Sequence, residues 1–229
     1  MNKSKYGLSA NVLKLIAIIT MTIDHIGLIL LNDYTPFRII GRIAFPIFAY
    51  FISEGCRYTK NRFRYFLNVF LLGVVCHGIF FGVEKSLHNN ILLTFSISIL
   101  FVYVYNWFIL HKKGIVWIIL SLSLLYIAIE LLSDYNITFD YGFYGIILPW
   151  IISLSNDKNY KLLLTIAGLT LISLSSQGVQ WYSFLAIPFL FLYNGKRGKL
   201  NIKYFFYAFY PLHMVIIYII DLLINTEIY

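Results

Sequence analysis

Long apolar blocks alternate with short polar segments along this chain of 229 residues. A helix that crosses a bilayer needs about 20 mainly apolar residues, with a range of about 17–25. The sixth, seventh and eighth blocks are shorter, so we expect them to be tilted, broken or re-entrant, and the number of full crossings could fall to eight or seven. The pattern predicts an all-α, polytopic bundle forming a single domain over residues 1–229. Its nine candidate spans are 12–31, 38–56, 64–83, 91–110, 115–133, 142–154, 161–176, 181–194 and 204–224.

Composition supports a membrane protein rather than a large soluble core. Hydrophobic residues make up 60% of the chain and charged residues only 12%, whereas a soluble domain averages about 25% charged. The net charge of +8 lies in the segments between apolar blocks, which argues against nucleic acid as a partner and is typical of topology signals. Cys56 and Cys76 have no metal-ligand or disulfide spacing, and no metal is expected.

The Lys and Arg residues predict the orientation. With the N-terminus in the cytoplasm and nine crossings, fourteen of the eighteen basic residues lie in inner segments, the first of them Lys3 and Lys5. Only Arg38, Arg42 and Lys85 lie in outer segments, and Lys14 can extend to the inner interface. This asymmetry follows the positive-inside rule and predicts a multi-pass protein of the bacterial cytoplasmic membrane.

Asp24 and His25 lie in the first apolar block, VLKLIAIITMTIDHIGLILL. Ionisable residues at this depth cost about 3 kcal/mol each on insertion scales and usually serve a function. From the helical rise, His25 lies about 20 Å from the inner end of its span, and His213 lies about 14 Å into the last span. Arg42 is near the outer end of the second span, where it is expected either to pair with Asp24 or to anchor the helix at the interface.

Other polar residues gather at the outer level or at the inner boundary. Tyr210 shares a helix face with His213, and His77, a structural histidine in the alternative interpretation, lies in the outer part of the third span. Glu54, at the inner boundary close to Arg57, is predicted either to contact a cytoplasmic ligand or to form a structural pair. Arg57 and Arg62 are predicted either to attract such a ligand or to serve topology alone. Candidates for substrate binding are Tyr210, His77, His88, Asn89, Asn90, Asp140 and Tyr141, and candidates for cofactor binding are Glu54, Arg57 and Arg62.

Three segments, LKLIAIITMTIDHIG, GRIAFPIFAYFISEG and YFFYAFYPLHM, resemble motifs of the TraX family, and NNILLTFSISI and DYGFYGIILP resemble its weaker middle motifs. The resemblance extends from about residue 12 to 220. The founding member acetylates the N-terminus of a pilin subunit, and the family is similar to a broader superfamily of transmembrane acyltransferases. The resemblance implies acyl transfer from a cytoplasmic donor, usually acetyl-CoA, to an acceptor at the outer face, with His25 in the catalytic role. The pilin substrate is not carried over.

Acyl transfer needs a base for the acceptor and a positive group for the developing oxyanion. His25 is the candidate base or acyl carrier, and His213 is a candidate second proton carrier or ligand contact. Neighbours on a helix point about 100° apart, so Asp24 is expected to position Arg42 rather than His25. Arg42 or Tyr210 is expected to stabilise the oxyanion. The predicted function is an acetyl-CoA-dependent or other acyl-CoA-dependent acyltransferase acting on an amine or hydroxyl of an exported peptide, lipid or glycan. A proton-coupled transporter and a non-enzymatic assembly factor are the alternatives.

Overall fold

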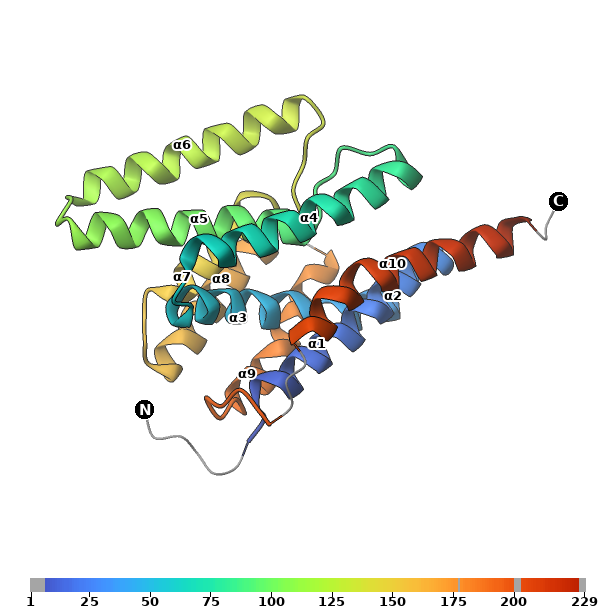
Figure 1. The fold of residues 1–229 in the computed structure, drawn as a ribbon, viewed down its shortest axis with the longest axis horizontal. Helices are drawn as coiled ribbons and strands as arrows, with labels where there is room; N and C mark the ends of the chain where they lie inside the picture. Colours follow the sequence, from blue (N-terminus) through green and yellow to red (C-terminus); the bar gives the residue numbers. More distant parts are fainter. Residues whose placement is uncertain (1–6, 177, 200–202, 227–229) are drawn as a thin grey trace. The chain divides into compact units, whose positions relative to one another are not determined.

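The computed structural model describes residues 7–176, 178–199 and 203–226, and helices account for most of these ranges (Figure 1). The chain divides into two compact units. Unit 1 combines Met1–Phe51 with Asp157–Tyr229, and unit 2 comprises Ile52–Asn156. The two ends of the sequence therefore fold together, while the middle of the sequence forms its own unit.

Unit 1 is built around its first and last helices. Helix α1 begins after Ser9, whose side chain accepts a hydrogen bond from the amide of Val12, and it continues directly into the π-helix η1. Helix α10 packs against both α1 and η1 and runs in the same direction as α1 (Figure 1). The elements of unit 1 are α1 (Ala10–His25), η1 (Ile26–Leu30), α2 (Thr35–Gly41), the first half of α3 (Ala44–Tyr58), α8 (Lys158–Ser176), the 3₁₀ segment η2 (Gly178–Ala186), α9 (Ile187–Phe191) and α10 (Lys203–Thr226).

The start of α1 is tied to the segment that follows α9. The amide of Leu8 donates to the carbonyl of Leu192 over 2.8 Å, and the Leu8 carbonyl accepts from Asn194 over 3.0 Å. The amides of Ala10 and Asn11, in the first turn of α1, donate to the carbonyls of Lys196 and Arg197. Two of the amides that a helix start leaves without intrahelical partners are thus satisfied by the later segment.

Unit 2 contains the second half of α3, α4 (Arg62–Glu84), α5 (Ile91–Leu110), α6 (Ile115–Asp134) and α7 (Gly142–Ser153). Helix α5 packs against both α4 and α7. The Ser98 hydroxyl donates to the Ile146 carbonyl over 2.6 Å, and Phe101 meets Trp150 edge to face. These contacts make α5 the central helix of the unit.

Helices cover all nine predicted apolar blocks in the described part of the chain. Six helical stretches there are long and apolar enough to cross a membrane: Ala10–Leu30, Thr35–Tyr58, Arg62–Val83, Ile91–Leu110, Ile115–Asp134 and Phe205–Asn225. Gly142–Ser153 and Gly178–Phe191 are shorter apolar helices. The all-α membrane class is therefore supported. The number of nine crossings, the cytoplasmic N-terminus and the single domain stay predictions, and Lys3 and Lys5 lie outside the described residues.

Candidate active site

The two intramembrane histidines of unit 1 contact each other directly. The Nδ1 atom of His25, the last residue of α1, lies 2.9 Å from the Nε2 atom of His213 on α10. The rings stack with 5.1 Å between their centroids. His213 is buried with 5% of its surface exposed, and Tyr210 packs edge to face against it. Residues 188 positions apart in the chain thus form one hydrogen-bonded pair.

The hydrogen bonds of this pair determine where the protons lie when both rings are neutral. The Nδ1 atom of His213 lies 3.0 Å from the carbonyl oxygen of Phe209, and a carbonyl oxygen only accepts. His213 therefore carries its hydrogen on Nδ1 and accepts at Nε2. It follows that His25 donates from Nδ1, which leaves the lone pair of its Nε2 atom available as a base.

Irregular backbone flanks both histidines. The π-helix η1 begins at Ile26, immediately after His25, and such segments occur often at functional sites. Pro211 lies inside α10, two residues before His213. Proline has no amide hydrogen and cannot donate to the carbonyl of Tyr207. The helix geometry is therefore altered on both sides of the pair, which is a local feature that a regular helical pattern does not predict.

Asp24 faces a different set of partners from His25. Its Oδ2 atom accepts from Arg38 over 2.6 Å, and its Oδ1 atom lies 3.8 Å from Arg42. Arg38 also pairs with Asp33 over 3.0 Å. The sequence predicts a pairing of Asp24 with Arg42 and gives Arg38 only as a basic residue of an outer segment. The missed signal is the spacing of Arg38 and Arg42, because residues four apart in a helix lie on one face.

Close packing at Gly41 makes the contact between Asp24 and α2 possible. A Cβ atom at position 41 would overlap the Cβ, Cγ and Oδ1 atoms of Asp24. Only glycine lets the two backbones approach this closely. The ion pairs of Asp24 therefore depend on a small residue in the facing helix.

Gln180 is a buried polar residue that is not among the predicted site residues. Its Oε1 atom accepts from Arg42 over 3.5 Å, and only 4% of its surface is exposed. Within the described ranges, its Nε2 group has no hydrogen-bond partner. A buried amide donor beside a guanidinium can stabilise a developing oxyanion. The available signal was a glutamine directly before the apolar block 181–194.

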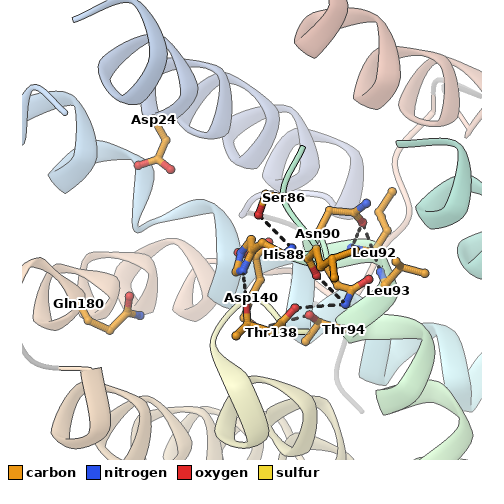
Figure 2. Close-up of polar contacts among 12 residues, drawn as sticks. Asp24, Ser86, His88, Asn90, Leu92, Leu93, Thr94, Thr138, Asp140 and Gln180 are labelled. Carbon is orange, nitrogen blue, oxygen red and sulfur yellow. Dashed lines mark hydrogen bonds and ion pairs between the residues drawn. The ribbon is translucent and has the colours of Figure 1, made fainter. Parts of the chain in front are cut away.

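Unit 2 brings the predicted outer-loop residues together (Figure 2). The Nε2 atom of His88 lies 3.0 Å from Oδ1 of Asp140, and its Nδ1 atom lies 2.7 Å from the hydroxyl of Thr138. Asn89 donates its amide to the Thr138 carbonyl over 2.7 Å, and its own carbonyl accepts from Asp140. Because a carboxylate accepts, a neutral His88 donates from Nε2 and accepts the Thr138 hydroxyl at Nδ1. Thr138 was not predicted.

The other predicted residues of unit 2 have contacts outside this cluster. Asn90 caps α5 by accepting from Leu92 and Leu93, and it donates to the Gly73 carbonyl over 2.9 Å. Tyr141 precedes α7 with a positive φ of 60°. Three further residues complete this set: the ring of His77 lies near Phe81, Arg57 donates to the Asn156 carbonyl and lies over Tyr58, and Arg62 lies over Tyr103. Glu54 is half-buried on α3.

Across residues 7–176, 178–199 and 203–226, no group of three or more His, Cys, Asp or Glu side chains is placed to hold a metal ion. The residues with chemical potential are instead the histidine pair, the two arginines beside Asp24, and Gln180. This set can hold and move a proton and can stabilise negative charge.

Comparisons with known proteins place the chain among membrane proteins of one family. The family model described as "TraX protein" matches residues 9–221. The "Probable fimbrial assembly protein FimC, serogroup H1" of Dichelobacter nodosus is 24% identical over 91% of this chain and 94% of its own length. An uncharacterized protein of Rickettsia prowazekii (strain Madrid E) is 35% identical over 46% of this chain and 40% of its own length. No solved structure matches the chain significantly.

Proposed function

Because the chain belongs to the TraX family, we propose that it is an integral membrane acyltransferase. The donor is acetyl-CoA or another acyl-CoA, and the acceptor is an amine or hydroxyl on an exported peptide, lipid or glycan. One observation carries the proposal: the His25 and His213 rings are hydrogen-bonded so that a neutral His25 presents an unprotonated Nε2. A base held in one tautomer by a second histidine suits acyl transfer.

In the proposed step, Nε2 of His25 accepts the proton of the acceptor N–H or O–H group. The acceptor nitrogen or oxygen bonds to the carbonyl carbon of the thioester, and the carbon–sulfur bond breaks. The thiolate leaves with the proton that His25 held, so the product is an amide or ester and a free thiol. His213 keeps the His25 ring oriented. Its Nε2 atom accepts the hydrogen bond from the Nδ1–H group of His25 while His25 is an imidazolium.

Arg42 and Gln180 are the proposed oxyanion donors. Arg42 donates to the Oε1 atom of Gln180 over 3.5 Å, and the Nε2 group of Gln180 lacks a partner among the described residues. Asp24 neutralises and positions the two arginines through its ion pairs. Such preorganised donors are worth about 3–4 kcal/mol each in comparable sites.

The remaining predicted residues have proposed roles at the two membrane faces. With the N-terminus in the cytoplasm, the polar cluster of His88, Asn89 and Asp140 is proposed to bind the acceptor, since it offers both donors and acceptors. At the opposite face, contact of Glu54, Arg57 and Arg62 with the acyl-CoA stays a prediction.

A second candidate function is a membrane assembly factor without catalysis. The name of the Dichelobacter nodosus relative, a probable fimbrial assembly protein, favours it. In that case Asp24, His25 and Arg42 would serve packing alone, and conservative substitutions would be tolerated. A proton-coupled transporter, with Asp24, His25 and His213 as a relay, also needs no acyl donor.

The deciding experiment follows transfer of radiolabelled acetyl groups from acetyl-CoA into the lipid and peptide fractions of inverted membrane vesicles. We expect His25→Ala to lower the rate about 10²- to 10⁴-fold, the contribution of a general base, while the protein stays in the membrane. The matched control is His111→Ala, since His111 is exposed, caps the end of α5 and lies against Trp107 of that helix. Transfer that is unchanged in His25→Ala would rule out His25 as the base. If the wild-type protein transfers no acetyl groups and the purified protein binds no acetyl-CoA, the assembly factor or the transporter is favoured.

A further inference from the structure

A lysine occupies an unusual position inside unit 1. The ammonium group of Lys14 on α1 lies 5.1 Å from the ring centroid of Phe51 and 5.8 Å from that of Phe206. Phe51 is buried and Lys14 is half-buried. None of the ion pairs formed by the described residues includes Lys14. A cation is therefore held between aromatic rings without a carboxylate to neutralise it.

Lys14 shares a helix face with the proposed base. Residues 14 and 25 are separated by eleven positions, which corresponds to a rotation of about 20° and a rise of about 16 Å. On α10, the partners Phe206 and His213 are seven positions apart, so they also share a face and lie about 10 Å apart along the axis. The boundary between α1 and α10 thus carries a cation at one level and the histidine pair deeper along the same line.

More positive charge lies at the Lys14 end of this boundary. The backbone carbonyls of Lys196 and Arg197 accept from the first turn of α1, one turn before Lys14. A Cβ atom at Gly198, which has a φ of +98°, would lie 2.8 Å from the Ser9 hydroxyl. The side chains of Lys196 and Arg197 are exposed. Two segments distant in sequence therefore supply cations to the same end of unit 1.

We propose that Lys14, together with the basic segment Lys196–Lys199, binds the phosphate groups of the acyl donor, whose thioester then reaches along the α1–α10 boundary to His25. The inference rests on the proposed acyltransferase function. The ligand of such a site is an elongated molecule with an anionic end and a reactive acyl end. A cation flanked by aromatic rings suits the anionic end, because a phosphate can displace weak cation–π contacts with charge-assisted hydrogen bonds.

The test measures equilibrium binding of two thioesters to purified protein in detergent: acetyl-CoA, and S-acetylpantetheine, which has the same thioester but no phosphate. We expect Lys14→Met to weaken acetyl-CoA binding about 10- to 100-fold, the effect of losing a charged hydrogen bond. Binding of S-acetylpantetheine should not change, which also shows that the variant is folded. Lys14→Arg should retain most acetyl-CoA affinity. The matched control is Lys113→Met, which removes an exposed cation 6.0 Å from the Trp117 ring.

Two results would overturn the inference while leaving the proposed function intact. In the first, wild type binds acetyl-CoA and Lys14→Met binds it equally well. In the second, Lys14→Met loses both thioesters to the same extent, which indicates a structural role for Lys14. If wild type binds no acetyl-CoA, the proposed function itself fails. Lys14-dependent binding of phosphatidylglycerol vesicles would then assign the cation to a lipid headgroup and overturn the donor site.

Discussion

Replacing Gly41 with alanine tests whether the Asp24 network depends on close approach of α1 and α2. The new Cβ atom would overlap the Cβ atom of Asp24, which is bonded to the α1 backbone and cannot rotate away. The helices must separate, and overpacking of this kind costs about 1–3 kcal/mol. At about 2–4 °C per kcal/mol for a chain of this length, the unfolding temperature should fall by about 2–12 °C.

The same change should lower acyl transfer, because moving Asp24 shifts Arg38 and Arg42 with it. Unfolding followed by tryptophan fluorescence in detergent gives the stability, and the vesicle assay gives the rate. The matched control is Gly78→Ala in α4, where a Cβ atom meets nothing within 4 Å and where alanine favours a helix over glycine. Equal stability and activity of the two variants would refute the argument that Asp24 needs a glycine opposite it.

Two further predictions concern single hydrogen-bonding side chains. His213→Phe removes the acceptor for His25 Nδ1–H and should lower kcat about 100-fold with little change in the KM for acetyl-CoA. His213→Gln, whose amide oxygen can accept this hydrogen bond, should restore part of kcat. Equal kcat values for the two variants would contradict the argument that His213 fixes the tautomer of His25. Asn90→Ala removes the α5 cap and a bond to the Gly73 carbonyl, so it should lower unfolding free energy by about 1–3 kcal/mol. Asn61→Ala, which loses one exposed cap bond, should cost less in the same thermal unfolding measurement.

Apolar block length was sufficient to predict where the helices lie but not where their axes bend. The predicted span 38–56 lies within the helical stretch Thr35–Tyr58, but the structure divides this stretch between α2 and α3 after Gly41. The change from α-helix to π-helix at Ile26 was also unpredicted. The division between α2 and α3 and the π-helix both depend on contacts with other helices, such as the approach of Asp24 to Gly41. The hydrophobic pattern does not predict those contacts.

The candidate site was partly predictable for a related reason. Asp24, His25 and His213 stand out because ionisable residues in apolar blocks are costly. Their partners do not stand out in this way. Arg38 lies near a helix end, where basic residues are common, and Gln180 is uncharged. Which side chain each helix presents to its neighbour is decided by tertiary packing, so the pairing of His25 with His213 required the structure.

The division of the chain into a split unit and a continuous unit has a consequence for biosynthesis. Residues 52–156 can complete their own contacts while the ribosome still holds the rest of the chain. The hydrogen bond between His25 and His213 spans 188 positions, so it cannot form until α10 has left the ribosome. A chain released early would insert its first spans yet contain only one of the two histidines. The pair of His25 and His213 is therefore assembled only in a protein that has been synthesised through α10.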